Sequence, residues 1–529
     1  MKLIVCLFGI FCYGECAKIL GAFIYPSVSH QSTFQPIWKE LSLRGHQVTV
    51  ITPNPLNDPT LTNLTEIDVS FVYKNPKLRH IINNIKKDDH PLKAHKIIFE
   101  LFRFIFEEEM QYEPIKRLIE NQDKHAYDLL LIQYSYFTDP LLAFLNKFNA
   151  PLVGVSSLGL LLHGHDAMGN PTHPVVSPDF MLGLPKRLNI IQKVESLFHN
   201  FAYRLFYHWY ILPKLDESAR KYFGDDMVPL RELHKNVSLV LYNNNRLIHE
   251  VRPNVPNVIE INQLHIKKPK PLPEDIQKYL DSSPQGVVYF SFGTNVKSSN
   301  LSYTLRKEII GALAELPYKV IWKWEDDYLP DQPINVLVRK WLPQQDILNH
   351  PNVKVFLTQG GLQSIEETIN CEVPIVGMPF FTDQPTNIQK IAELGMGLYI
   401  EHTTVTKDIL KNALLEVAQN KKYKENVVKY KQILVDEPMR GVEKAIWWIE
   451  YVMRHNGAAH LRSMAADMTF FEYFMIDVVV FSLIVISLMI YISLKLFSYA
   501  KMLLITLSRK LKPARNIVLK IEINKVKKN

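Results

Sequence analysis

The feature that most constrains this chain is an uncharged run close to its C-terminus. Residues 478–494 contain only apolar residues, serine and tyrosine, and they lie within a longer apolar segment, 470–494. Because a helix of roughly 20 apolar residues spans a bilayer, we predict a transmembrane helix over 470–494. A basic tail, 495–529, follows it, and basic residues collect on the cytoplasmic side of membranes. The tail is therefore expected in the cytosol.

The first residues have the pattern of a secretory signal peptide. Met1 and Lys2 precede an apolar run at 3–11, so we predict a signal peptide over 1–16 and a mature chain that begins at residue 17. Of the four cysteines only Cys371 lies outside this segment, which leaves no partner for an intramolecular disulfide. The body of the chain is then lumenal, and three sequons become candidates for N-glycosylation, at Asn63, Asn236 and Asn300.

The basic tail carries much of the formal net charge of +8. The body that remains is close to neutral, which argues against a nucleic-acid partner. Lys525 and Lys527 stand fifth and third from the end, and this arrangement resembles the lysine-based retrieval signals of endoplasmic-reticulum membrane proteins. We therefore expect a single-pass type I protein of the endoplasmic-reticulum membrane. The alternative is a tail that binds anionic lipid.

The N-terminal half shows the alternation of a parallel α/β domain. Apolar residues 19–25, a helical pattern that ends at residue 43 and a second apolar run at 48–51 form a βαβ unit. Further strands are predicted at 128–132 and 151–156, with helical patterns between them. We assign residues 17–265 to an N-terminal Rossmann-like domain.

A proline-rich segment separates this half from a second α/β series. Residues 266–274 hold three prolines and three lysines, which neither a helix nor a central strand accommodates, so we place an interdomain linker at 266–284. A second Rossmann-like domain is assigned to 285–465. Its strands are predicted at 286–292, 318–324, 353–358, 374–379 and 398–400. Two Rossmann-like domains facing a cleft are the expected architecture.

An aromatic-rich stretch at 197–210 allows three interpretations. Polar residues interrupt it too often for a membrane span. It is a core helix, a wall of an acceptor pocket or a helix at the membrane interface.

Three blocks within 341–387 have the residue pattern of a nucleotide site. Residues 356–358 end a strand, 359–361 turn tightly, and a helix begins near Ser364. Free backbone N–H groups then face the turn, a geometry that suits a diphosphate. Glu367 lies one turn into the helix and can accept hydrogen bonds from ribose hydroxyls, although glutamate also simply favours a helix N-terminus.

Two further pairs of residues suit the ends of a UDP-sugar. Asp383 and Gln384 follow a predicted strand end, where open α/β sheets bind ligands, so they could hold sugar hydroxyls or merely shape a turn. Trp341 offers a flat face on which uracil can stack, with Gln344 nearby. A lone tryptophan of this kind is otherwise a core residue.

Together these blocks closely resemble the donor-binding signature of the UDP-glycosyltransferase superfamily, which includes the UDP-glucuronosyltransferases. The resemblance covers nearly the whole chain and implies a GT-B fold. It implies that residues 17–265 form the acceptor-binding domain and residues 285–465 the UDP-sugar-binding domain. It also implies donor contacts: uracil with Trp341 and Gln344, phosphates with Thr294, Gly360, Gly361 and Ser364, ribose or phosphate with Gln363 and Glu367, and sugar with Asp383 and Gln384.

One position departs from the vertebrate pattern of this family. Most vertebrate members have histidine where this chain has Gln359, and the variant looks like that of membrane-bound arthropod members. The amide of Gln359 can still donate a hydrogen bond to phosphate, although it carries no charge.

The resemblance further implies a catalytic pair. His30 follows the first strand and precedes a helix, and histidine titrates near neutrality and can take a proton from a hydroxyl. An isolated histidine is more often structural, but the family pattern makes this one the base. Where vertebrate members carry the partner aspartate this chain has Gln133, and Asp139 matches arthropod relatives. We assign Asp139, which could equally be an N-cap.

These residues lead to one expected function and two rivals. We expect inverting transfer of a hexose, glucose before glucuronate, from a UDP-sugar to a hydroxyl of a small lipophilic acceptor, as in detoxification. No cofactor or metal is expected, because the acidic run 325–327 looks like a solvated turn. Gln133 and Gln359 make a catalytically impaired, lipophile-binding member the alternative. A single-pass receptor is disfavoured by the disulfide-free body, and the oligomeric state stays open.

Overall fold

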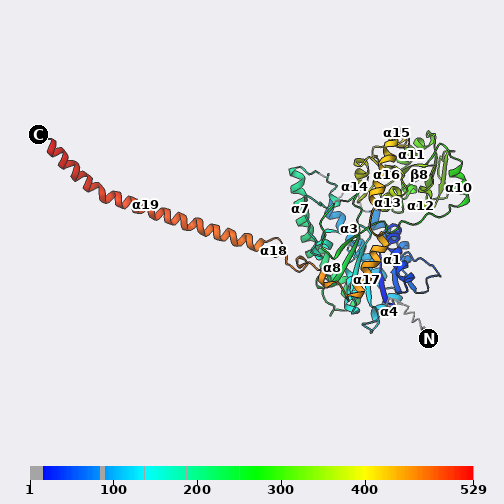
Figure 1. Ribbon diagram of the computed structural model, residues 1–529, viewed down its shortest axis with the longest axis horizontal. Coiled ribbons are helices and arrows are strands. Elements are labelled where there is room, and N and C mark those ends of the chain that lie inside the picture. The colour runs from blue at the N-terminus through cyan, green and yellow to red at the C-terminus, as the bar shows by residue number, and fades with distance from the viewer. Residues whose placement is uncertain (1–15, 84–89, 136, 186, 250, 528–529) are drawn as a thin grey trace, which may run out of the picture. The chain divides into compact units, whose positions relative to one another are not determined.

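The computed structural model describes residues 16–83, 90–135, 137–185, 187–249 and 251–527. The predicted signal peptide, 1–16, therefore lies almost entirely outside the described residues. The chain separates into two compact units, Met1–Ala466 and Asp467–Asn529, and the first holds two α/β halves (Figure 1).

The first half is built on a seven-stranded parallel sheet in the order β3-β2-β1-β4-β5-β6-β7. Its side chains alternate between two cores. In β4, Leu130 and Ile132 pack into one cluster, whereas Leu129 and Leu131 pack into the other. Both faces are thus covered, as parallel sheets require. The strands are β1 (Lys18–Ala22), β2 (Gln47–Thr52), β3 (Leu64–Asp68), β4 (Leu129–Gln133), β5 (Leu152–Ser156), β6 (Val237–Asn243) and β7 (Val258–Ile261).

Helices of the same half cover the two faces of this sheet. A π-helical turn, Tyr207–Ile211, joins α7 to α8. The helices are α1 (Val28–Leu43), α2 (Pro76–Asn83), α3 (Pro91–Met110), α4 (Glu113–Glu120), α5 (Phe144–Lys147), α6 (Leu162–Ala167), α7 (Ile190–Phe206), α8 (Leu212–Phe223) and α9 (Leu230–Leu233).

The aromatic-rich stretch at 197–210 has two different sides. Tyr203 and Tyr207 are buried in the first core, so one side is a core helix, as one of the three interpretations holds. Phe198 and Trp209 are exposed on the other side. One side of the stretch therefore packs in the core, and the other side is exposed.

The second half repeats the plan with a six-stranded parallel sheet in the order β10-β9-β8-β11-β12-β13. Its strands are β8 (Val287–Ser291), β9 (Lys319–Lys323), β10 (Val336–Arg339), β11 (Val353–Thr358), β12 (Ile375–Gly377) and β13 (Gly397–Tyr399). Its helices are α10 (Glu274–Asp281), α11 (Tyr303–Ala314), α12 (Gln344–Leu348), α13 (Leu362–Asn370), α14 (Gln384–Glu393), α15 (Lys407–Gln419) and α16 (Lys421–Val435). The prediction of two Rossmann-like halves is confirmed.

Strand order reverses once in each sheet, between β1 and β4 and between β8 and β11. Loops that leave neighbouring strands at such a point run in opposite directions and open a crevice at the carboxyl ends of the strands, where α/β sheets bind ligands. His30 lies in the first turn of α1, which follows β1, and Gly360 lies in the loop after β11. The fold therefore places both parts of the predicted site at switch points.

The predicted boundaries need two corrections. Helix α10 lies inside the predicted linker, 266–284, and buries Ile276 and Leu280 in the second half. The structural linker thus ends at residue 273, because acidic residues favour the helix start at Glu274.

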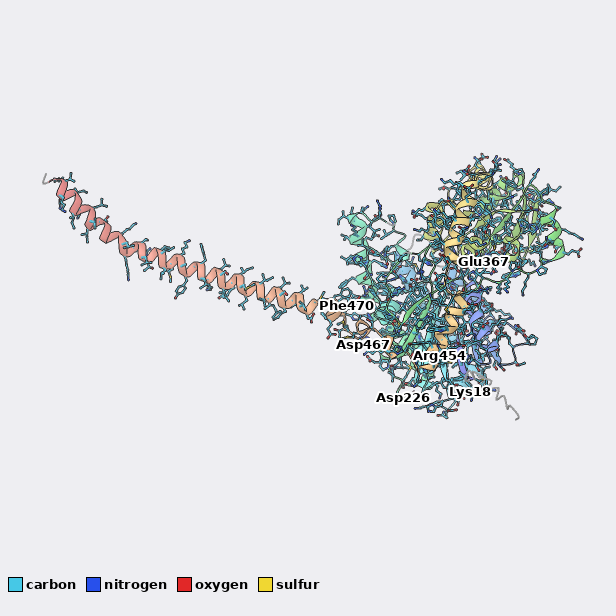
Figure 2. The ribbon with its side chains drawn as sticks, in the orientation of Figure 1. Lys18, Asp226, Glu367, Arg454, Asp467 and Phe470 are labelled. Atoms are coloured by element: carbon cyan, nitrogen blue, oxygen red, sulfur yellow. The ribbon has the colours of Figure 1, made fainter. Side chains whose placement is uncertain are left out.

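The second correction concerns α17 (Gly441–Arg454), which we had placed in the second domain, 285–465. Its buried residues Ala445, Ile446 and Ile449 pack with the first sheet, and α17 lies beside α1 (Figure 1). In Figure 2, Arg454 lies with the half that holds Lys18. The pattern of apolar residues on α17 shows that it has a buried face but not which sheet it covers.

The unit Asp467–Asn529 contains α18 (Phe470–Tyr473) and α19 (Ile476–Val526). Met475 between them has a positive φ of 52°, so the long helix begins at residue 476. The prediction had placed its start at residue 470 and its end at residue 494, whereas the helix continues through the tail. Among the described residues, α19 is the one helix that is long and apolar enough to cross a membrane, with a mean hydropathy of 2.5 over its most apolar window.

We predict that Ile449→Ala on α17 destabilises the first half. The side chain is fully buried in the core beneath the first sheet, and removing a buried isoleucine to alanine costs about 2–5 kcal/mol. Urea unfolding monitored by tryptophan fluorescence measures the change. Glu443→Ala, at an exposed position of the same helix, is the matched control, and equal midpoints for the two variants would contradict the placement of α17.

Candidate active site

His30 stands in the first turn of α1, directly beyond β1. Its side chain is buried, its Nδ1 lies 2.6 Å from Ser157 Oγ, and the ring of Tyr25 stands edge-on to the imidazole with centroids 5.0 Å apart. Burial lowers the pKa of His30 to about 4, so the ring is neutral at neutral pH. A neutral imidazole can accept a proton from a hydroxyl.

Asp139 does not join His30 in this structure. It begins a 3-10 helix, Asp139–Ala143, and its Oδ1 accepts a hydrogen bond from Tyr207 at 2.9 Å and lies 2.8 Å from His234 Nε2. Burial alone would raise the pKa of Asp139, but the contacts with His234 and Tyr207 and the nearby His163 together outweigh burial and lower the pKa. No hydrogen bond or ion pair among the described residues connects Asp139 with His30, and no N-cap bond from its side chain is found there either.

Gln133, at the position of the vertebrate aspartate, forms hydrogen bonds with a backbone amide and with a neighbouring side chain. Its Oε1 accepts a hydrogen bond from Tyr25 N at 3.0 Å, and its Nε2 donates to Ser135 Oγ at 3.1 Å. Ser157 is thus the partner that sequence reasoning missed. The feature that could have identified Ser157 is its position just after β5, at the edge of the sheet where ligands bind.

The turn between β11 and α13 has the geometry predicted for a diphosphate. Gly360 has a φ of 88°, and a Cβ there would meet Ile388 Cγ1 at 2.3 Å. Gly361 is the N-cap of α13, whose first backbone N–H groups have no helical partner. Thr294, after β8, has a buried Oγ1 without a hydrogen-bond partner among the described residues. An anion in the turn would satisfy these donors.

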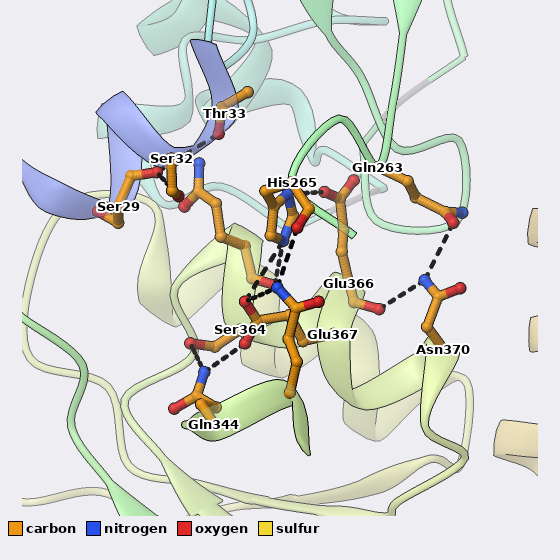
Figure 3. Close-up of polar contacts among 12 residues, drawn as sticks. Ser29, Ser32, Thr33, Gln263, His265, Gln344, Ser364, Glu366, Glu367 and Asn370 are labelled. Atoms are coloured by element: carbon orange, nitrogen blue, oxygen red, sulfur yellow. Dashed lines mark hydrogen bonds and ion pairs between the residues drawn. The ribbon is translucent and has the colours of Figure 1, made fainter. Parts of the chain in front are cut away.

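A polar network links the predicted uracil and ribose contacts (Figure 3). Gln344 Nε2 donates to Ser364 Oγ at 3.0 Å and to Glu367 Oε2 at 2.5 Å. Gln345 Nε2 donates to Glu367 Oε1 and to the His265 carbonyl, each at 3.0 Å. Burial raises the pKa of Glu367 to about 7. The structure thus brings Gln344, Ser364 and Glu367 together, and it adds Gln345 and His265, which the sequence analysis missed.

Trp341 is 64% exposed, which rules out the core interpretation and leaves its ring free to stack on a base. Lys323 lies nearby, with its Nζ 5.9 Å from the Trp341 ring centroid. The same ammonium donates to the Gly293 carbonyl and contacts Glu325, each at 2.9 Å. Lys323 was also missed, although a buried lysine at the end of an apolar strand is unusual enough to attract notice.

Asp383 and Gln384 begin α14 beside the diphosphate turn. Asn387 Nδ2 donates to Asp383 Oδ2 at 2.7 Å, and burial raises the pKa of Asp383. Gln384 Oε1 accepts the backbone N–H of Phe380 at 2.9 Å, and its Nε2 donates to Gln359 Oε1 at 3.3 Å. Gln384 therefore shapes the loop and orients Gln359, whereas Asp383 is directed toward a cavity.

That cavity has a volume of about 280 Å³ and lies between the two halves. Loop residues from the first half, such as Leu161, Val176 and Asp179, form one wall, and α14 contributes Asn387 and Lys390 to the other. Asn200 of α7 lines it too, so part of the stretch 197–210 forms a wall of this cavity. His30 is not among the lining residues, so the cavity adjoins Asp383 and does not enclose the candidate base.

The two halves of the site meet at Ser157. Gln363 Nε2 of α13 donates to the Ser157 carbonyl at 3.4 Å, while the Ser157 hydroxyl contacts His30. Ser27 Oγ donates to Asn295 Oδ1 at 3.4 Å across the same cleft. The candidate base and the diphosphate turn thus belong to one site between the halves.

Two α/β halves of this kind also occur in solved glycosyltransferases. The crystal structure of glycosyltransferase VinC in complex with DTDP is similar over 83% of this chain and 100% of that chain, with a TM-score of 0.56 and 16% sequence identity. At this identity the likeness concerns the fold. The fold is that of the GT-B glycosyltransferases.

Sequence comparison defines the family more closely. Residues 20–510 match the family model described as "UDP-glucoronosyl and UDP-glucosyl transferase". "UDP-glucosyltransferase 2" of Dactylopius coccus is 33% identical, over 88% of this chain and 90% of that protein. "UDP-glucuronosyltransferase 2B7" of Homo sapiens is 31% identical, over 96% and 97%. The chain belongs to the UDP-glycosyltransferase family, and it is an enzyme of glycosyl transfer from UDP-sugars.

We predict that alanine lowers thermal stability at one glycine of the turn and UDP affinity at the other. Gly360→Ala forces a left-handed backbone on a residue with Cβ, at about 1–2 kcal/mol, and clashes with Ile388, so thermal stability falls. Gly361 has a φ of −64°, and its nearest neighbour would be Gln359 Nε2 at 3.5 Å. Gly361→Ala therefore keeps the melting temperature but weakens UDP binding, as titration calorimetry measures. Unchanged UDP affinity in Gly361→Ala would contradict a diphosphate in this turn.

A second prediction concerns Glu366, whose side chain is fully buried next to Asn245. Burial raises its pKa from 4.5 to about 8. A raised carboxyl pKa gives stability that is complete below 4.5 and is lost as the pH rises to 8. Glu366→Gln cannot titrate, so its melting temperature relative to wild type increases over this range. Exposed Glu425→Gln is the control, and a difference that stays flat with pH would refute the assignment.

Proposed function

We propose that this enzyme transfers glucose from UDP-glucose, with inversion at C1, to a hydroxyl of a small lipophilic acceptor. The observation that carries the proposal is the junction at Ser157, where the neutral base His30 and the donor-binding helix α13 meet. Glucose in place of glucuronate rests on the arthropod-like turn with Gln359 and on the relative named UDP-glucosyltransferase. Glucuronate is the other donor to be tested.

In the proposed reaction Nδ1–H of His30 donates to Ser157 Oγ, which fixes the tautomer and leaves Nε2 as the base. Nε2 takes the acceptor's proton as its oxygen bonds to C1 of the sugar. The bond from C1 to the UDP oxygen breaks on the opposite face, so the configuration inverts. Ser157 accepts a hydrogen bond from the imidazolium in the role that a carboxylate would fill.

The leaving diphosphate gains negative charge in this step. The N-terminal amides of α13, the hydroxyl of Thr294, the amide of Gln359 and the ammonium of Lys323 surround its proposed position. Such prearranged donors stabilise developing charge without reorganisation. We therefore propose that transfer itself needs no metal ion. Activity that persists in EDTA would support this.

The cavity beside Asp383 is the proposed acceptor site. Its volume of about 280 Å³ suits a small organic molecule, and its walls combine apolar side chains with a few polar groups. Conjugation of lipophilic compounds, as in detoxification, is the role we propose for such a cavity. Phenols and steroid-like alcohols are the acceptors to test first.

We further propose a type I location in the endoplasmic-reticulum membrane. Helix α19 has the length and composition of a span, and the lysines near the C-terminus resemble a retrieval signal. Asn63, Asn236 and Asn300 are exposed, as glycosylation in the lumen requires. The basic tail is placed to contact anionic lipid.

A catalytically impaired, ligand-binding member is the second candidate function. The observation in its favour is that His30 contacts a hydroxyl and has no hydrogen bond or ion pair with a carboxylate among the described residues. A hydroxyl stabilises the imidazolium less well than a carboxylate does. Binding of UDP-glucose without turnover would favour this candidate.

We predict graded losses for variants of His30 and Ser157. Full-length enzyme in membranes is assayed for acceptor-dependent UDP release with UDP-glucose or UDP-glucuronate. His30→Ala abolishes release with either donor. Ser157→Ala removes one hydrogen bond, worth roughly 1 kcal/mol, and lowers kcat about tenfold at most, with little change in the KM for donor.

The exposed His125→Ala is the matched control for these variants. Equal activity of His30→Ala and wild type would eliminate His30 as the base. Full activity of Ser157→Ala would eliminate the hydroxyl as its positioning partner.

A further inference from the structure

A second cluster of polar side chains lies away from the proposed transfer chemistry. His95 of α3, His199 of α7 and Asp179 of the loop before α7 converge, and the Nε2 atoms of both histidines lie 3.0 Å from the same oxygen, Asp179 Oδ2. The three ligand atoms all lie within 4.8 Å of one another. No part of the transfer mechanism uses these residues.

The surroundings of the cluster are closed on one side and open on the other. The side chains of His95 and His199 are 0% and 5% exposed, and Tyr203 packs edge-on against His95 with centroids 4.7 Å apart. Asp179 lines the cavity beside Asn387. A bound ion would therefore have protein on most sides and the cavity on one.

The carboxylate of Asp179 presents one oxygen, Oδ2, to both imidazoles. The other carboxylate oxygen, Oδ1, accepts the backbone N–H of Met181 at 2.9 Å. That bond fixes the plane of the carboxylate and directs Oδ2 at both imidazoles.

The separations of the ligand atoms can be compared with those of a tetrahedral metal site. Zinc binds histidine nitrogen and carboxylate oxygen at about 2.0–2.2 Å, which puts neighbouring ligand atoms roughly 3.3 Å apart. The two nitrogen-to-oxygen separations of 3.0 Å need only a small expansion, and all three ligand atoms lie within 4.8 Å of one another. Magnesium and calcium prefer oxygen ligands, whereas two imidazoles favour a transition metal.

We propose that His95, Asp179 and His199 bind one divalent transition-metal ion of the zinc class, with a fourth position open to the cavity. The ion joins three segments that are distant in sequence, α3, the loop around 179 and α7, and so holds one wall of the cavity in place. It is separate from the diphosphate turn, so the proposed metal-free transfer step is unaffected. Only the link to acceptor binding rests on the proposed function.

The first test measures zinc binding directly. Full-length protein in detergent is stripped with EDTA and titrated with Zn²⁺ by calorimetry. We expect wild type to bind one Zn²⁺ more than Asp179→Asn or His199→Gln, and Zn²⁺ to raise the melting temperature of wild type alone. The exposed His125→Ala is the control and should behave as wild type. Equal stoichiometry in wild type and both variants would overturn the site.

A second test needs no variant, in case a substitution disturbs folding. Co²⁺ added to the stripped wild-type protein should give the intense visible bands of tetrahedral coordination, and Zn²⁺ should bleach them. Weak bands typical of octahedral surface sites would overturn the proposal. UDP-glucose binding by each variant reports on the fold of the donor half, and it should equal that of wild type whether or not transfer activity is present.

Discussion

The constraint on which the rest of this structure depends is the burial of both faces of each parallel sheet. Apolar side chains such as Leu130 and Leu131 fill the two cores on either side of the first sheet. Polar chemistry is thereby confined to the loops at the carboxyl ends of the strands. His30, Ser157, Thr294 and Gly360 all lie in such loops or in the helix turn that follows, which is why two separate sheets can build one site.

Ser157 has a central place in that site because its two polar groups face different halves. The hydroxyl contacts His30 and the carbonyl accepts from Gln363. A movement of one half against the other therefore alters both contacts of Ser157 together.

The interior strands and the tight turn between β11 and α13 were predicted well, because buried apolar runs and glycine-rich turns are local patterns. The sequence analysis missed β3, β7 and β10, which are edge strands with polar or partly exposed residues, and it overlooked β6, although that strand is apolar. Asp139 was predicted to be the partner of His30, but the direction of a loop after a strand is set by tertiary packing. In the structure Asp139 contacts Tyr207 and His234 and not His30. Lys323 and Gln345 were missed for the same reason.

The return of α17 to the first sheet gives the two halves a second covalent connection. The chain crosses once at 266–273 and once more between α16 and α17, at 436–440. Two neighbouring connecting segments allow the halves to rotate about the axis that joins the segments. They restrict a twist of one half against the other. The chain also continues into the unit Asp467–Asn529 from the first half, where Ala466 lies against Gly169. With α19 in a bilayer as proposed, the half that is attached directly to the span is the one proposed to bind the lipophilic acceptor.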